Sequence, residues 1–422
     1  MIFFWFPYDY HVFLFSYFVL DFSMSFRLTH IRDYHRFIAI DLGLYRVRAG
    51  IYDISESALT CTGFSSVRQS RKNFYQGSIA DISGVIQSIE QAVIQASQSL
   101  DSIPNDVIMS FPSQSFISDS ITAQYIRADK DSLLTMQEID GMIKRTESES
   151  FERARAKSRK QFGVLNDDLK LVSSTIIDIT IDGRTITNPI GFSGWRIRLT
   201  VLNIFVPSSE FNIIRSVVSS LWKKVISLIP EPLILPKLIE AAGYVEQSIC
   251  IVDIGYQHTT ITIVDCDRIL GFEVFSCGTE MLMELISLHQ KNLSFLQIEN
   301  TLCSPELLNN QNYRESLNEF FLYIQDALFG YLNSEHINIQ FDHLFLHGNI
   351  FENKLILEEF SKIIEEKLGY EIHKKRIYEI GEDSLHHDNC MTQGLALMAN
   401  ELLLVKKDPL VRILRYILYQ YE

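Results

Sequence analysis

The same strand–turn–strand pattern occurs twice in this chain, far apart in the sequence. One copy comprises residues 37–43 and 46–52, and the other comprises residues 249–255 and 259–264. In each copy an apolar strand ends in Asp-x-Gly, which leaves a carboxylate at the strand end and lets a ligand approach the glycine backbone closely. A single Asp-x-Gly turn is common by chance. Two in the same context predict two similar half-domains that face each other across a cleft.

The carboxylates of the two turns are candidate ligands for a metal–phosphate group in that cleft. Asp41 and Asp253 would hold water ligands of Mg²⁺, and backbone amides around Gly43 and Gly255 would contact the phosphates. Arg46 would add a positive charge. Two further glycines would let the backbone lie against a nucleoside: Gly278 and Gly348. The alternative is that both aspartates only stabilise their turns.

Composition and charge restrict the class of protein. A chain of 422 residues is too long for one hydrophobic core, so we expect several lobes. The formal net charge of −14 argues against non-specific nucleic-acid binding, which needs a basic surface. The six cysteines include no C-x-x-C pair, which predicts reduced thiols in a cytoplasmic protein. The basic cluster at residues 153–160 lies beside glutamates and is interpreted as a solvated helix end or loop.

Hydrophobic periodicity predicts strands and helices in alternation. Strands are expected at residues 106–112, 171–181, 185–187, 195–206, 268–275 and 343–349, with a hairpin turn at Asp182-Gly183. Helices are expected at residues 82–99, 136–151, 211–229, 237–243 and 354–368, within the stretch 285–340, and around Gly394.

Residues 1–35 form an aromatic-rich N-terminal extension. No Lys or Arg precedes Arg27, so the extension is a poor signal peptide. Pro7, Asp9 and Asp21 interrupt the apolar run that a membrane span needs. Because Met24 lies just before the first strand, a misassigned upstream start is favoured over an aromatic membrane anchor.

The C-terminal residues 406–422 have the pattern of an amphipathic helix. Six apolar side chains fall on one stripe: Leu410, Ile413, Leu414, Ile417, Leu418 and Tyr421. Arg412 and Arg415 lie off the stripe, and Asp408 and Pro409 suit a helix start. Such a helix can dock on the protein's own core or lie in a membrane interface. Its tyrosines, its local positive charge and its terminal position favour weak, reversible binding to an anionic membrane.

Three short motifs together resemble the actin/Hsp70-type ATPase fold. Asp41-Leu-Gly43 and Asp253-Ile-Gly255 are similar to its two phosphate motifs, and Leu346-His-Gly-Asn349 is similar to its adenosine motif. Within that group, residues 187–196 (TNPIGFSGWR) resemble the Asn-Pro-hydrophobic-Gly-x-x-Gly segment of the FtsA family of bacterial cell-division proteins. The resemblance runs from residue 36 to the C-terminus.

This resemblance implies an α/β, actin-like ATPase fold, in which two duplicated ribonuclease-H-like domains enclose a nucleotide cleft and an FtsA-type 1C (SHS2-like) subdomain is inserted. It implies ATP and Mg²⁺ as ligands, with Thr259 and Asn349 added to the binding residues. The implied subdomains are 1A (36–104 and 207–235), 1C (105–206), 2A (236–285 and 342–405) and 2B (286–341), followed by a membrane-targeting helix (406–422).

Several residues depart from the pattern of this fold family. Tyr256, Gln257 and His258 follow Gly255, where the family usually has further glycines, and bulky side chains there obstruct close backbone approach. At other positions this chain has Leu44 where the family usually has Ser or Thr, Arg46 near a customary Lys, Thr260 where Asp is usual, and Asn349 where Gly is usual. Residues 297–308 contain no Lys or Arg, where the family usually has a Lys. We therefore expect weakened nucleotide binding without fast hydrolysis.

The resemblance implies an adaptor at the cytoplasmic face of the cell membrane, at the division site. Its implied partners are the C-terminal peptide of FtsZ at subdomain 2B, other copies of itself in a filament, an anionic membrane, and other division proteins through subdomain 1C. A PilM-like pilus-assembly protein is the first alternative, because residues 253–260 fit that family equally well. A small-molecule kinase of the same fold is the second, although no residue marks its catalytic base.

Overall fold

The computed structural model describes residues 34–55, 58–162, 168–186, 188–290, 293–302, 310–380 and 387–404. The N-terminal residues 1–33, Thr187 of the FtsA-like segment and the C-terminal amphipathic segment 406–422 lie outside the described residues. Within the described ranges, no helix is both long and apolar enough to cross a membrane.

Two five-stranded sheets have the same strand order and the same strand directions. The first runs β3 (Leu59–Arg68), β2 (Arg46–Ser55), β1 (Tyr34–Leu42), β6 (Asp106–Phe111) and β11 (Lys224–Pro230). The second runs β14 (Arg268–Phe275), β13 (Thr259–Asp265), β12 (Ser248–Ile254), β15 (His343–His347) and β16 (His373–Arg376). In each sheet the first three strands are antiparallel and the last two are parallel to the central strand. The predicted duplication is confirmed.

The two Asp-x-Gly motifs are the turns of equivalent hairpins in these sheets. Leu42 pairs with Val47 at the end of the β1–β2 hairpin, and Ile254 pairs with Thr259 at the end of the β12–β13 hairpin. The turns therefore comprise residues 43–46 and 255–258. Both central strands end at the same edge of their sheets. Asp41 and Asp253 therefore occupy equivalent positions next to the two hairpin turns.

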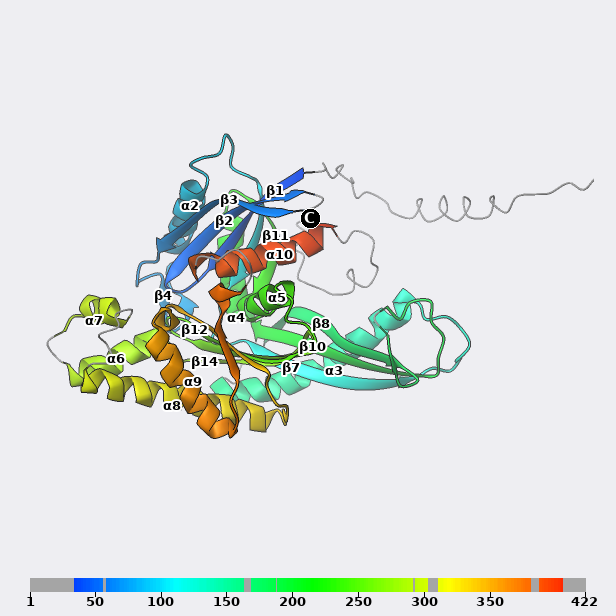
Figure 1. Cartoon of the computed structure of the whole chain (residues 1–422). Helices are drawn as coiled ribbons and strands as arrows, with labels where there is room; N and C mark the ends of the chain where they lie inside the picture. The colour runs from blue at the N-terminus through cyan, green and yellow to red at the C-terminus, as the bar shows by residue number, and fades with distance from the viewer. Residues whose placement is uncertain are drawn as a thin grey trace, which may run out of the picture.

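Helices α5 (Ile234–Ala241) and α10 (Cys390–Leu404) pack against each other between the two sheets (Figure 1). Buried side chains of both helices belong to one core with the first sheet and with one face of the second. Gly394 allows this contact, because a Cβ there would lie 2.6 Å from Ile234 Cγ2. The small-residue helix expected around Gly394 is confirmed. It packs on β1, although the sequence places it with the second half.

Helices cover the outer faces of both sheets. On the first, α2 (Ile82–Ala96) begins at Asp81, whose carboxylate accepts from the Gly84 amide. Its apolar positions recur at helical spacing and are buried: Val85, Ile89, Ala92, Val93 and Ala96. The remaining helices are α4 (Ser208–Ser220) in the first half, and α6 (Thr279–His289), α7 (Phe295–Leu302), α8 (Gln311–Ser334) and α9 (Lys354–Leu368) in the second. Short elements are β4 (Phe74–Tyr75), β5 (Ser78–Ile79) and the 3-10 turns Glu231–Leu233, Asn349–Glu352, Ile377–Glu379 and His387–Asn389.

A separate lobe is inserted between β6 and α4. It is a four-stranded antiparallel sheet of β7 (Ile117–Ile126), β10 (Arg196–Pro207), β8 (Leu169–Ile181) and β9 (Arg184–Thr185), with helix α3 (Met136–Phe162) beside it. Figure 1 shows this inserted lobe extending away from the two halves. Because β6 pairs with β1, the boundary expected at residue 105 falls before a strand of the first sheet.

The basic cluster at residues 153–160 lies in the C-terminal part of α3, which agrees with the helix-end alternative and not with a loop. Arg153 donates to Asp119, which is buried in β7, at 2.9 Å. Lys157 forms an ion pair with Glu335, just beyond α8, at 2.7 Å. The cluster therefore has a structural role, joining the inserted lobe to the second half.

One expected helix is wrong in its second part. Residues 208–220 are helical, but Lys224–Pro230 is strand β11, which pairs with β6. The run Val225-Ile-Ser-Leu-Ile is buried except for the half-buried Ile226, and a mainly apolar run of that length fits a buried parallel strand as well as a helix. Strands β3, β7 and β16 and the short strands β4 and β5 were not predicted from the sequence.

Candidate functional site

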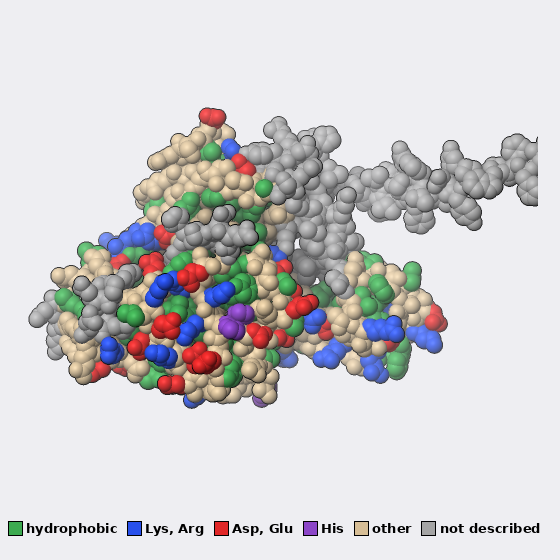
Figure 2. Space-filling view, viewed as in Figure 1, with side chains coloured by type: hydrophobic (Ala, Val, Ile, Leu, Met, Phe, Trp, Pro, Cys, Tyr) green, Lys and Arg blue, Asp and Glu red, His purple; other side chains and the backbone are tan. Residues whose placement is uncertain are grey.

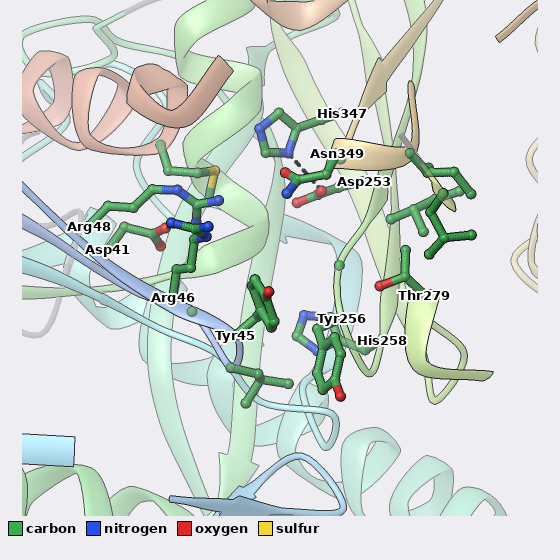
Figure 3. A pocket seen from close by; sticks show the side chains of 18 of the residues that line it. Asp41, Tyr45, Arg46, Arg48, Asp253, Tyr256, His258, Thr279, His347 and Asn349 are labelled. Atoms are coloured by element: carbon green, nitrogen blue, oxygen red, sulfur yellow. Dashed lines mark hydrogen bonds and ion pairs between the residues drawn. The ribbon is translucent and has the colours of Figure 1, made fainter. Parts of the chain in front are cut away.

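A cavity of about 330 Å³ lies between the two equivalent hairpins, and Figure 3 shows its walls. Seven of the predicted residues line it: Asp41, Gly43, Arg46, Asp253, Gly255, Gly348 and Asn349. Thr259 lies beneath the floor, fully buried, and donates to the Cys277 carbonyl at 2.6 Å. Gly278 lies behind the second turn, where a Cβ would come within 2.4 Å of the Tyr256 carbonyl oxygen. The structure thus brings the predicted residues of both halves to one place.

Asp41 is held by two groups from neighbouring strands. The Ser110 hydroxyl of β6 donates to Oδ1 at 2.8 Å, and Arg48 of β2 donates to Oδ2 at 3.0 Å. Arg48 also lies 3.5 Å from Asp388. Burial opposes the charged guanidinium, but the carboxylates of Asp41 and Asp388 outweigh it and raise the pKa of Arg48. Asp41 is therefore one half of a buried ion pair.

Asp253 has a different partner. The Nδ1 atom of His347, at the end of β15, lies 2.8 Å from its Oδ1 (Figure 3). Burial disfavours the Asp253 carboxylate, but the interaction with His347 outweighs burial and lowers the pKa of Asp253. This carboxylate too has a side-chain partner within the site.

The sheet registers explain why the two aspartates have different partners. Arg48 stands directly opposite Asp41 in the β1–β2 pair, whereas Thr260 stands opposite Asp253 in the β12–β13 pair. On the parallel side, β6 supplies Ser110 in the first half and β15 supplies His347 in the second. Each half therefore places one basic side chain beside its aspartate, from opposite sides of the central strand.

A third acid–base pair lies between these two. Glu231 follows β11 in the Pro230-Glu-Pro232 segment, and its Oε2 lies 3.2 Å from Nε2 of His258. Burial opposes protonation of His258, but the Glu231 carboxylate outweighs it and raises the pKa of His258. The Nδ1 atom of His258 is buried and has no hydrogen-bond partner among the described residues. His258 therefore has one ring nitrogen that no described residue satisfies.

This pair should make stability depend on pH. With its pKa raised above the unfolded value of 6.5, His258 takes up a proton on folding, so its stabilising contribution is complete below that value and is lost as pH rises through the folded pKa. We expect the unfolding free energy of the wild type to fall by about 1 kcal/mol more than that of Glu231→Gln between about pH 6 and about pH 9. Urea unfolding across this range measures it, and parallel pH profiles would contradict it.

Two tyrosines face each other across the mouth of the cavity (Figure 3). The rings of Tyr45 in the first turn and Tyr256 in the second have centroids 5.2 Å apart. The Tyr45 hydroxyl donates to Glu299 of α7, and Arg68 donates to the same carboxylate at 2.9 Å. Burial, together with Glu280, raises the pKa of Tyr256 to about 12, so it stays a neutral phenol. These contacts close the side of the cleft on which the two turns meet.

Backbone contacts reinforce the closure. The Gln257 side-chain oxygen accepts from the Gly77 amide at 3.0 Å, and the Gln257 backbone carbonyl accepts from the Gln114 side chain at 3.3 Å.

At the far wall of the cavity, Gly348 has a φ of 121°, and a Cβ there would come within 2.3 Å of the Ile254 carbonyl oxygen. This position requires glycine.

The cavity lining also includes residues that were not predicted to bind, among them Tyr45, Arg48, Glu231, Tyr256, His258, Glu299 and His347. From the sequence, Tyr256 and His258 were noted only as departures from the family pattern. The register of a tight hairpin would have placed Arg48 opposite Asp41. Glu231 directly follows strand β11, which had been assigned to a helix.

The arrangement of the carboxylates does not suit Mg²⁺. No three His, Cys, Asp or Glu side chains of the described residues form a cluster that could hold a metal ion. A water-mediated site needs carboxylate oxygens that face the metal's water shell. Both Asp41 oxygens have donors from the chain, and His347 holds Asp253. The predicted metal role of these aspartates does not fit the geometry.

No family model and no curated protein matches this sequence. Solved structures do match its fold. One is a PilM–PilN type IV pilus biogenesis complex, with 14% identity and a TM-score of 0.61 over 86% of this chain and 97% of that chain. The chain has the actin-like ATPase fold.

Two weaker likenesses belong to the same comparison. MreB 5 of Spiroplasma citri bound to AMPPNP has 11% identity and a TM-score of 0.46 over 88% of this chain and 97% of that chain. The ethanolamine utilization protein EutJ from Carboxydothermus hydrogenoformans has 12% identity and a TM-score of 0.45 over 86% and 89%. The finer resemblance to the FtsA family stays a prediction.

Proposed function

We propose that this protein is a nucleotide-binding adaptor of the FtsA type, which self-associates at the cytoplasmic face of the cell membrane and anchors FtsZ filaments at the division site. The observation that carries the nucleotide part is the cavity between two equivalent Asp-x-Gly turns, with Arg46 and Arg48 on one wall and Gly348 and Asn349 on the other. In an actin-like fold, this is where the two halves meet around a ligand.

The same cavity argues for an adaptor over a fast ATPase. The acidic side chains that would activate water or hold a metal are occupied by Arg48, His347 and His258. The Tyr45–Tyr256 pair lies between the two turns and must separate before phosphates can enter. A ligand bound here would act mainly on the angle between the two halves, and therefore on assembly.

The nucleotide part is tested by calorimetry with ADP and ATP in magnesium buffer. Arg46 is half-buried on the cavity wall and has one hydrogen bond of 3.3 Å, to Ser66, so its removal should leave the fold intact. Loss of a charged hydrogen bond to phosphate weakens binding by roughly tenfold or more, and we expect that for Arg46→Ala. Arg198→Ala, on the exposed face of β10, is the matched control and should bind as the wild type does. Absence of binding in the wild type would reject the nucleotide part.

An exposed apolar surface on the inserted lobe supports a role in assembly. Its side chains lie on two neighbouring segments joined by backbone hydrogen bonds: Ile126, Leu133, Phe192 and Trp195. Figure 2 shows hydrophobic side chains beside Lys and Arg at the end of this lobe. Exposed patches of this kind are typical of protein contacts. We propose that other division proteins bind here.

The partners distinguish the two adaptor candidates. A PilM-like role is the second candidate, because the PilM–PilN structure matches nearly the whole described chain in fold. Binding of an FtsZ C-terminal peptide, and none of a pilus-assembly peptide, supports the FtsA role; the reverse supports the PilM role. The membrane helix is tested by deleting residues 408–422. If the shortened protein still floats with anionic liposomes, the membrane-helix proposal is rejected.

A further inference from the structure

Every carboxylate on the cavity wall is already held by a donor from the chain. The pairs are Asp41 with Arg48 and Ser110, Asp253 with His347, Glu231 with His258, and Glu299 with Tyr45 and Arg68. They come from both halves, so this is a property of the whole cavity. A dication would therefore meet carboxylates that already accept hydrogen bonds from the chain.

A divalent cation would compete with these pairs. Each Asp41 oxygen already accepts one hydrogen bond, from Ser110 at 2.8 Å or from Arg48 at 3.0 Å. A metal near Asp41 would also stand beside the Arg48 guanidinium, and the two positive charges repel at such short range. The side chain of Arg48 is 14% exposed, so it cannot simply turn into solvent.

What the cavity offers a ligand is hydrogen-bond donors. Arg46 and Arg48 reach into it from the first hairpin (Figure 3). On the second half, the Glu231–His258 pair lines the cavity as well. Guanidinium donors are well suited to phosphate oxygens.

We infer that the cleft binds the phosphate groups of a nucleotide without a divalent metal ion, and that Arg46 and Arg48 supply the positive charge that a metal supplies elsewhere. This inference rests on the proposed nucleotide binding. It adds that nucleotide is recognised as the free anion. It also accounts for the expected absence of fast hydrolysis, because no metal bridges the phosphates.

Titration of the full chain with ADP and with ATP, in excess magnesium chloride and in excess EDTA, tests the inference. We expect dissociation constants that agree within about threefold in the two buffers. Binding that weakens more than about tenfold in EDTA would overturn the inference and leave the nucleotide function standing. No binding in either buffer would reject both.

Arg48→Met sharpens the test. Loss of the Arg48 guanidinium should weaken nucleotide binding in EDTA by about tenfold or more. Magnesium should restore part of the affinity, because Asp41 is then free to hold the metal's water. Arg198→Met is the matched control and should show neither effect. Arg48→Lys keeps the charge beside Asp41 and should stay metal-independent; a magnesium requirement in this variant would count against the inference. The wild-type comparison decides the question if Arg48→Met does not fold.

Discussion

Asp41→Ala is expected to lower the free energy of unfolding by about 3 kcal/mol, because it leaves the Arg48 guanidinium buried without its main counter-charge. Asp41 is 2% exposed and makes the shorter of the two ion pairs of Arg48, at 3.0 Å against 3.5 Å for Asp388. The Asp388 carboxylate is 40% exposed and compensates only in part. Chemical denaturation followed by circular dichroism measures the loss.

The double variant Asp41→Leu with Arg48→Met separates the cost of an unpaired charge from the worth of the pair. Buried ion pairs replaced by apolar side chains of similar size are often nearly neutral, so we expect the double variant within about 1 kcal/mol of the wild type. Glu152→Ala removes the exposed carboxylate of a surface arginine pair and should cost less than about 0.5 kcal/mol. A double variant as unstable as Asp41→Ala would show that the pair itself stabilises the fold.

The duplicated architecture could be predicted from the sequence because its signal is local. Each Asp-x-Gly turn lies between two apolar strands, and a hairpin needs no information from elsewhere in the chain. Helix α9 could be placed at residues 354–368 for the same reason: its apolar positions recur at helical spacing, and Asn353 and Gly369 mark its ends. Strand β11 could not, because an apolar run carries no period that distinguishes a buried strand from a helix.

The character of the site depends on contacts between strands that are distant in sequence. Arg48 is the exception, since hairpin register alone sets it against Asp41. His347 meets Asp253 only through the parallel register of β12 and β15, which no turn fixes. The contact of Tyr45 with Tyr256 requires the placement of one half against the other. Sequence therefore predicted two of the four carboxylates that line the cavity among the described residues, Asp41 and Asp253, but not that each has its own partner.

Tyr256→Gly is expected to bind ADP roughly tenfold more tightly than the wild type, because the Tyr45–Tyr256 pair must separate before phosphate can lie between the two turns. The ring pair spans the two halves, with centroids 5.2 Å apart. An aromatic pair contributes about 0.5–1.5 kcal/mol beyond the area it buries. In the wild type this contribution is lost when ADP binds, which makes binding weaker by that amount. Glycine also restores the close backbone approach that the side chain obstructs. Calorimetric titration measures the gain.

Tyr256→Phe is the matched control. It keeps the ring against Tyr45 and removes only the 2.9 Å hydrogen bond to Glu280, which lies within the second half and is not broken when the cleft opens. Its affinity for ADP should therefore stay within about twofold of the wild type. If glycine weakens binding while phenylalanine preserves it, the Tyr256 ring contacts the nucleotide itself. The departure from glycine in the second motif would then be part of the binding site, and the obstruction argument would fail.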